Sequence, residues 1–275
     1  MHTFMRKPVK TLKMRKLSTQ EIGSAKREMI SLLAPSPDPF VSIMYPINLD
    51  VCTRFIQEVS AQKKMRITIT SVLNRLIGLA IAENPVYNQL VFGSSIYQLE
   101  EIHLANIVLV PGTDALTYVI LRNPHHKSLE KIQQEFFLML VNKKKEYAKA
   151  TTTAADTISR FIYRFGLYLL IGEKRAFRIA YERGLMSNIS LSTHIYGTPA
   201  RFTMVKDVIN PMNITPRFHA CGPSMQPVVK NGTVTAGEVL NLHVTADHRI
   251  LGGVHAHRFG MALERIAASP EKYLL

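Results

Sequence analysis

The sequence predicts a protein of the α/β (α+β) class, in which strands and helices share one large domain. Residues 240–245 alternate apolar and polar side chains, which is typical of a strand with one buried face. A helical pattern follows, in which Phe259, Leu263 and Ile266 recur at i, i+4 and i+7 until Pro270 ends it. A chain of 275 residues is long enough for one such domain with a full core.

The other elements are predicted in chain order by the same two periodicities. A serine or threonine cap opens the first helix. Helices are expected over residues 18–33, 51–62, 66–84 and 128–147, and strands over residues 40–50 and 187–197. Two strand pairs are also expected, one turning at Pro111 and Gly112 and the other at Asn231 and Gly232.

The composition is that of a globular protein, with 47% hydrophobic residues. No apolar run approaches the roughly 18 to 20 residues that span a bilayer. Cys52 and Cys221 lie far apart and form no CxxC motif, so we expect reduced thiols in the core of a cytoplasmic protein. His125 and His126 have no carboxylate or cysteine nearby in the sequence, so no metal site is predicted.

A histidine follows the predicted C-terminal strand directly. Asp247, His248 and Arg249 come between that strand and the turn at Gly252 and Gly253. At such a point the local backbone can fix an imidazole ring while one of its nitrogens faces a cavity. This placement suits a general base.

The stretch around this histidine resembles the HxxxDG signature of the chloramphenicol acetyltransferase superfamily, in the DHRxxDG form of the 2-oxoacid dehydrogenase acyltransferases. Residues 84–88 (NPVYN) resemble the hPxxN turn of that family, and residues 187–197 (SNISLSTHIYG) resemble its FTISNLG segment. The resemblance runs from about residue 17 to residue 275. It implies a two-layer sandwich with a mixed β-sheet, a homotrimer with each active site between subunits, and a stand-alone catalytic domain over residues 17–275.

The resemblance also implies roles for individual residues. His248 is expected to be the general base, and Ser192 the donor to the oxyanion. Ser190 is the alternative donor, because a spacing of two residues puts it on the same face of a strand. Asp247, Arg249, Gly252 and Gly253 are expected to support the site, and Pro111, Gly112 and Thr113 to line the channel for substrate and coenzyme.

Gly252 departs from the family pattern, which has an aspartate at this position. In the family that aspartate is structural and pairs with an arginine near the start of the domain. The arginine would fall near Glu21, so both members of the ion pair are expected to be missing together. Loss of both partners costs much less than leaving one buried charge without its partner.

The function implied by the resemblance is transfer of an acyl group, with acetyl expected first. The donor would be a thioester of coenzyme A or an acyl carrier protein, and the acceptor a hydroxyl or thiol of a small molecule, for example in specialised-metabolite biosynthesis. No permanently bound cofactor is expected. A catalytically inactive scaffold is the alternative, which Gly252 favours.

The formal net charge of +14 also bears on the partners. Nucleic acid would suit this charge, but the basic residues are scattered and no zinc spacing or RNP-like motif is present, so this function ranks last. The phosphates of coenzyme A or an acidic carrier protein account for the charge equally well. The densest basic cluster lies within residues 1–16, which are expected to form an N-terminal arm.

An insertion is expected over residues 148–184, which have no counterpart in the family and look like a helical hairpin. Basic side chains surround the apolar run from Phe165 to Gly172. The hairpin is expected to cover the core. The alternatives are peripheral contact to a membrane through residues 160–183 and a cover over a substrate pocket.

Overall fold

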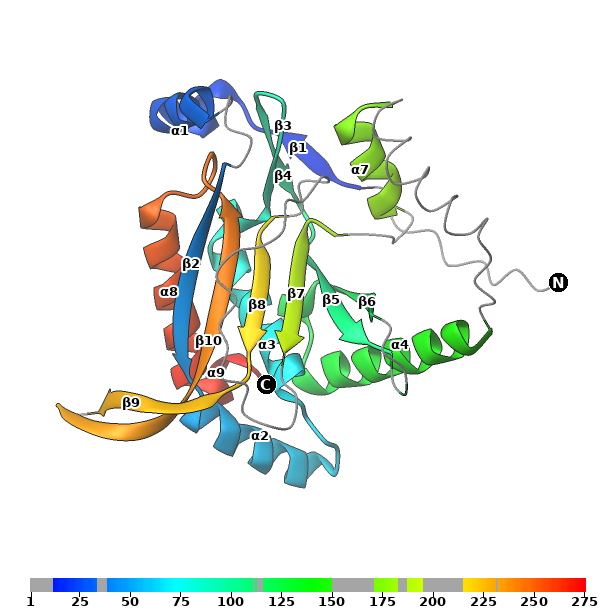
Figure 1. Ribbon diagram of the computed structural model, residues 1–275, viewed down its shortest axis with the longest axis vertical. Coiled ribbons are helices and arrows are strands. Elements are labelled where there is room, and N and C mark those ends of the chain that lie inside the picture. The colour runs from blue at the N-terminus through cyan, green and yellow to red at the C-terminus, as the bar shows by residue number, and fades with distance from the viewer. Residues whose placement is uncertain are drawn as a thin grey trace.

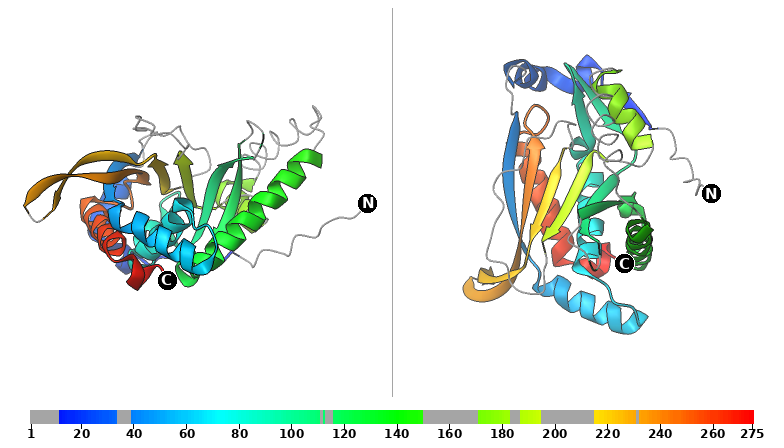
Figure 2. Two further views of the ribbon diagram at one scale, coloured as in Figure 1. Left: turned by 90° about the horizontal axis from the view of Figure 1, so that it is seen from below. Right: turned by 45° about the vertical axis from the view of Figure 1, so that its right-hand side comes forward.

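The computed structural model describes residues 12–33, 39–110, 112, 116–149, 171–182, 187–194, 215–230 and 232–275. These residues form two layers, a mixed β-sheet and a set of helices on one of its faces (Figures 1 and 2). The α/β class and the mixed sheet expected from the sequence are confirmed.

The large sheet has seven strands, with the order β2-β10-β8-β7-β5-β6 and with β9 paired to β10. The strands are β2 (Phe40–Asn48), β5 (His103–Leu109), β6 (Leu116–Arg122), β7 (Ile189–His194), β8 (Arg217–Cys221), β9 (Ser224–Lys230) and β10 (Thr233–Asp247). The pairs β5–β7 and β7–β8 are parallel, and the other pairs are antiparallel. Strand β10 is the longest, and it carries the predicted site histidine just beyond its end.

The described helices are α1 (Thr19–Leu33), α2 (Asp50–Lys63), α3 (Ile69–Glu83), α4 (Leu129–Lys149), α7 (Glu173–Glu182), α8 (Gly253–Ala268) and α9 (Pro270–Tyr273), with short 3₁₀ turns η1 (Pro85–Asn88) and η2 (Pro124–His126). Local signals fix several of their ends. Ser18 and Glu21 bond reciprocally at the start of α1. Thr68 caps α3. Gly23, at φ 73°, interrupts α1 in a conformation that favours glycine.

The main core lies between the sheet and the helices α2, α3 and α8. Phe259 of α8 is fully buried and stacks on Tyr87, with ring centroids 4.0 Å apart. It also contacts Phe218 of β8, at 5.8 Å. The apolar residues of the strands, which alternate with polar ones, therefore point toward the face of the sheet that the helices cover. This arrangement leaves the opposite face of the sheet free of helices α2, α3 and α8 (Figure 2).

A second, smaller sheet was not expected from the sequence. It has the order β1-β4-β3 and consists of β1 (Met14–Lys16), β3 (Gln89–Phe92) and β4 (Ser95–Leu99). Residues 14–16 of the predicted arm form strand β1 of this sheet, while residues 1–11 lie outside the described residues. A small apolar cluster covers this sheet: Leu12, Leu90, Phe92, Leu99, Phe177 and Tyr181.

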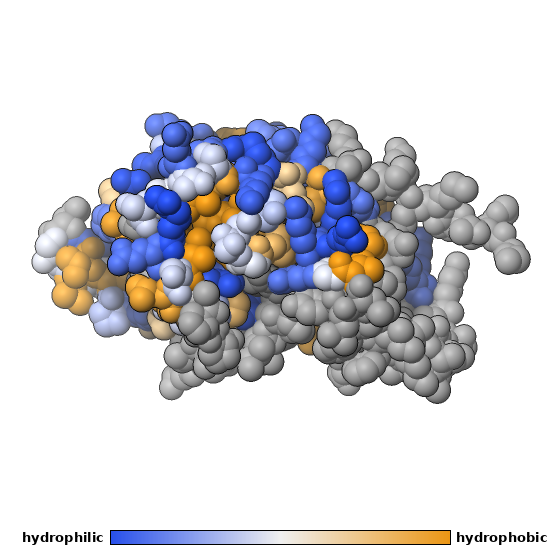
Figure 3. All heavy atoms as spheres, turned by 90° about the horizontal axis from the view of Figure 1, so that it is seen from above, coloured by the Kyte–Doolittle hydropathy of each residue, from blue (hydrophilic) through white to orange (hydrophobic). Residues whose placement is uncertain are grey.

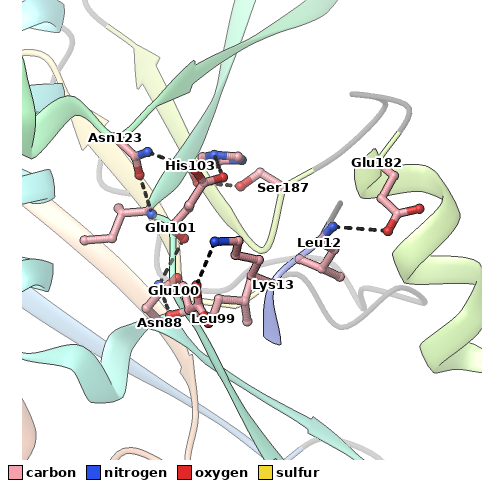
Figure 4. A network of polar contacts seen from close by, with 11 residues as sticks. Leu12, Lys13, Asn88, Leu99, Glu100, Glu101, His103, Asn123, Glu182 and Ser187 are labelled. Atoms are coloured by element: carbon pink, nitrogen blue, oxygen red, sulfur yellow. Dashed lines mark hydrogen bonds and ion pairs between the residues drawn. The ribbon is translucent and has the colours of Figure 1, made fainter. Parts of the chain in front are cut away.

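Helix α7 comes from the predicted insertion and packs on this second sheet. Figure 4 shows the backbone N–H of Leu12 donating to Glu182 of α7, at 3.1 Å, and Lys13 paired with Glu100, at 3.7 Å. Tyr181 stacks on His103, with ring centroids 5.0 Å apart. Burial lowers the pKa of His103 to about 4 although Glu101 lies close to it. Residues 173–182 of the predicted insertion thus form α7, and residues 150–170 and 183–186 lie outside the described part.

The described residues also bear on membrane-spanning helices and on the two cysteines. No helix among them is both long enough and apolar enough to cross a bilayer. Cys52 and Cys221 are buried free thiols, as predicted. Burial raises the pKa of the Cys52 thiol to about 11, so this side chain is an unreactive part of the core.

Candidate active site

The predicted site histidine lies in a tight turn where β10 ends and before α8 begins. The backbone N–H of His248 donates to the carbonyl of Pro39, at 2.8 Å, which ties the turn to the segment preceding β2. The N–H groups of Ile250 and Leu251 both donate to the carbonyl of Asp247, at 3.0 and 2.9 Å. The turn is therefore fixed on both sides by backbone bonds.

Asp247 and Arg249 form an ion pair that locks the same turn. The side chain of Asp247 is fully buried, and the Arg249 guanidinium reaches its carboxylate through Nε, at 2.9 and 3.1 Å, and through Nη2, at 2.6 Å. The backbone N–H of Arg249 donates to the same carboxylate, at 2.9 Å. A two-pronged guanidinium–carboxylate contact of this kind fixes orientation as well as charge.

The ring of His248 is held in one tautomer by its own loop. Its Nδ1 lies 2.7 Å from the carbonyl oxygen of Leu251. Because a carbonyl can only accept, Nδ1 must carry the proton, and Nε2 of the neutral ring then carries the lone pair. The half-buried imidazole thus has the form that a general base requires.

Gly252 is the first residue after this turn and the N-cap of α8. Its N–H donates to Nδ1 of His255, at 3.2 Å. A Cβ added to Gly252 would have that same Nδ1 as its nearest neighbour, at 3.9 Å, which is an ordinary van der Waals contact. The backbone here therefore has room for the Cβ of the aspartate that the family resemblance would place at this position.

Glu21, near which the partner arginine was expected, has a different role. Its carboxylate accepts from the N–H of Ser18, at 2.9 Å, and pairs with Arg15, at 2.8 Å. The Ser18 bond is the largest cause that lowers the pKa of Glu21, and Arg15 adds to it. This carboxylate therefore caps the N-terminal end of α1.

Gly252→Asp is expected to stabilise the protein by about 0.3–1 kcal/mol, because aspartate is a preferred N-cap and a negative charge is favourable at a helix N-terminus. Urea unfolding at fixed protein concentration measures the difference. Gly253→Asp is the matched control: Gly253 also has open space but is the first helical residue, where an aspartate has the favourable charge interaction with the helix end without the N-cap position. Destabilisation by the Gly252 variant, or an equal gain from both, would contradict the expectation.

Ser190 and Ser192 lie in β7, both nearly buried, on one face of the sheet. Ser192 is in register with His219 of β8, which is in register with His243 of β10. The rings of His219 and His243 are 6.0 Å apart, so the three side chains form a row across the strands. The intervening Leu191 is fully buried in the main core, which places this row on the face away from α8.

Within one chain the structure does not bring His248 and Ser192 together. Ser192 is level with His243 but two strands away, and His248 lies five residues further along the chain. Strand spacing and rise put the two Cα positions roughly 16 Å or more apart. A site that uses both side chains must therefore take them from different copies of the chain.

The predicted channel residues are described only in part. Gly112 is exposed and has φ 84° in the turn between β5 and β6, while Pro111 and Thr113 lie outside the described residues. Near the start of α4, the ring of His125 contacts that of His126, at 3.8 Å, and burial lowers the pKa of His125 to about 4. Among the described residues, no group of three or more potential ligands could hold a metal ion.

Sequence reasoning missed His255, which contacts the site loop directly. The available signal was a polar side chain three residues after an N-cap glycine, the spacing of a capping box. Figure 3 looks onto the end of the sheet where this loop and α1 lie. Hydrophilic side chains cover most of the described surface there, with apolar strips between them.

Comparisons with known proteins agree with this fold. Residues 216–275, which contain β8, β10, the loop and α8, match the family model described as 2-oxoacid dehydrogenases acyltransferase (catalytic domain). No curated protein matches the chain by sequence.

Several solved structures resemble the chain over most of its length. The dihydrolipoamide acetyltransferase (E2p) of Azotobacter vinelandii has a TM-score of 0.61 at 20% identity, with 92% of this chain and 90% of that chain covered. The cubic core of a pyruvate dehydrogenase multienzyme complex has a TM-score of 0.58 at 21% identity, with 93% and 90% covered. A chloramphenicol acetyltransferase has a TM-score of 0.58 at 13% identity, with 93% and 100% covered. The resemblance drawn from the sequence is confirmed, and the chain has the acyltransferase fold of these proteins.

Proposed function

We propose that this chain is an acyltransferase that moves an acyl group, in the first instance acetyl, from a thioester of coenzyme A or an acyl carrier protein to a hydroxyl or thiol of a small molecule. The observation that carries the proposal is the contact between Nδ1 of His248 and the carbonyl oxygen of Leu251, at 2.7 Å. With Nδ1–H bound to Leu251, the lone pair on Nε2 is available to take a proton. The family match over residues 216–275, which includes this loop, supports the same chemistry.

The reaction would proceed by direct transfer. Nε2 of His248 removes the proton from the acceptor, whose oxygen or sulfur forms a bond to the thioester carbonyl carbon. The carbonyl oxygen becomes an oxyanion, and the hydroxyl of Ser192 donates to it. The C–S bond then breaks, and the leaving thiolate takes the proton back from Nε2.

A homotrimer is part of this proposal, because one chain keeps His248 and Ser192 apart. The assembly supplies the serine of one subunit to the histidine of the next.

The hairpin of β9 and β10 projects from the body of the chain (Figure 1) and offers a contact surface. Met225, Val229 and Val234 on it are 68–72% exposed, and Val229 and Val234 are directly paired on one face. Exposed apolar surface of this kind is typical of a protein interface.

Replacing Val229 and Val234 together with aspartate is expected to shift the protein from three times the chain mass of 31.0 kDa toward the mass of one chain, because charges would be buried in the interface. Light scattering after size exclusion measures the mass. Thr235→Asp is the control, because Thr235 is exposed on the other face of the hairpin. A wild-type protein with the mass of one chain would contradict the trimer, and an unchanged trimer in the double variant would contradict the role of the hairpin.

The experiment that tests the function is the release of free thiol from acetyl-CoA, with and without panels of small hydroxyl and thiol acceptors. Acceptor-dependent release that is absent in His248→Ala supports acyl transfer by this site. Release by neither protein with any acceptor or carrier-bound donor would overturn it.

A catalytically inactive scaffold is the second candidate, and Gly252 is the observation that favours it. In the Azotobacter acetyltransferase, a serine, a histidine and an asparagine have been investigated for their role in the catalytic mechanism, and the asparagine comes four positions after the histidine. The spacing is that of His248 and Gly252, and glycine has no side chain to act there. A trimer that never turns over a thioester would support the scaffold.

A further inference from the structure

A single peptide group connects His248 to a second imidazole. The carbonyl of Leu251 accepts from Nδ1–H of His248, at 2.7 Å, and the N–H of Gly252 donates to Nδ1 of His255, at 3.2 Å. The carbonyl and the N–H belong to the same peptide bond. We infer that His255 is a positioning residue that holds this peptide, and through it the ring of His248, in the working orientation. The inference rests on the proposed function of the loop.

The position of His255 explains how it can do this. It is the third residue of α8 after the N-cap Gly252, where the side chain of a capping box accepts from the N-cap N–H. Gly252 has no side chain to complete such a box. The family pattern has an aspartate at the N-cap position that Gly252 occupies here. In this chain the side chain that contacts the N-cap is that of His255.

The contact requires a neutral His255, with its proton on Nε2 and a lone pair on Nδ1. Burial is the main effect that lowers the pKa of His255, and the positive charges of Lys26 from α1 and Arg258 from α8 lower it further. Lys26 is itself partly buried, and desolvation lowers its pKa. Burial and the charges of Lys26 and Arg258 therefore keep Nδ1 of His255 unprotonated, and able to accept a hydrogen bond, down to a pH below the usual pKa range of histidine.

The two bonds reinforce each other, because an amide whose N–H is engaged becomes a stronger acceptor at its carbonyl. His255 therefore strengthens the bond that fixes the tautomer of His248. The sign of the pH effect follows. As the pH falls through the lowered pKa of His255, Nδ1 gains a proton and becomes a donor that faces the Gly252 N–H. The peptide is released, and His248 loses its fixed acceptor.

Three variants test the inference. His255→Leu removes the acceptor and is expected to lower kcat by about 10- to 100-fold with KM nearly unchanged, since a small misplacement of the base affects chemistry more than binding. His255→Gln restores an acceptor typical of this helix position at every pH, and is expected to keep kcat within about threefold of wild type and to remove one ionisation from the acid side of the pH–kcat profile. His257→Gln is the matched control on the exposed side of the same helix and should resemble wild type.

A second readout does not depend on turnover. Nitrogen-15 NMR of the His248 ring is expected to show the Nδ1–H tautomer in wild type and in His255→Gln, and a mixture of tautomers in His255→Leu. Thermal unfolding checks that each variant is folded. If the tautomer changes as expected but wild type transfers no acyl group, the proposed function fails and the positioning role stands. If His255→Leu keeps both the tautomer and the wild-type kcat, the positioning role is overturned.

Discussion

Replacing His248 with alanine is expected to lower the rate of acyl transfer by about 10²–10⁴-fold, because no other group would take the proton from the acceptor. Ser192→Ala is expected to lower kcat by about 10²–10³-fold, through weaker stabilisation of the oxyanion. Steady-state kinetics with acetyl-CoA and the acceptor found by screening measure both effects. Equal and mild losses in the two variants would contradict the assigned roles.

Mixing the two inactive variants provides a sharper control. If each site takes His248 from one subunit and Ser192 from the next, a co-expressed one-to-one mixture forms some sites with both side chains intact. Random assembly into trimers is expected to restore about a quarter of the wild-type activity. Ser190→Ala mixed with His248→Ala serves as a comparison. Ser190→Ala is expected to be active by itself, so this mixture should keep about half of the wild-type activity. A Ser190→Ala variant that is inactive by itself and regains about a quarter of the activity in the mixture would identify Ser190 as the donor. No recovery when His248→Ala is mixed with an inactive serine variant would contradict a site shared between chains.

Arg249→Leu is expected to destabilise the protein by about 3–5 kcal/mol, since it leaves the carboxylate of Asp247 buried without its charged partner. The expectation rests on the full burial of Asp247 and on the paired contacts that the guanidinium makes with it. Urea unfolding at one fixed protein concentration measures the loss, because assembly contributes to the apparent stability.

The double variant Asp247→Asn and Arg249→Leu is the control for this prediction. Removing the charge as well as its partner is expected to recover most of the lost stability. A double variant as unstable as Arg249→Leu alone would show that the guanidinium acts through packing and not through its charge.

The sequence could predict the elements of the large sheet that have a clear period. Residues 240–245 alternate cleanly because Leu240, Leu242 and Val244 pack into the main core, while the polar residues between them lie on the other face of the sheet. Strand β3 gave no such signal, since all four of its residues are buried and its last three, Leu90 to Phe92, are apolar in succession. Strand β1 is three residues long within a basic stretch, and its pairing with β4 exists only in the folded chain.

The site, too, could be predicted from the sequence only in part. His248 could be predicted because a strand, a histidine and a glycine turn follow one another directly in the sequence. His255 could not be assigned from spacing alone, because its contribution depends on which way its ring turns and on which nitrogen carries the proton. The separation of His248 from Ser192 depends on the parallel placement of β7 and β8, which local sequence patterns do not determine.

The first strand has a practical consequence for shortening the chain. Leu12 is buried against the same cluster as Phe177 and Tyr181, and its backbone is bonded to Glu182. A protein that begins at residue 17, just after the basic cluster, would lack β1. The aromatic side chains of Phe177 and Tyr181 on α7 would then be uncovered. A protein cut there should bind hydrophobic dyes and precipitate more readily, whereas one cut before residue 12 should not.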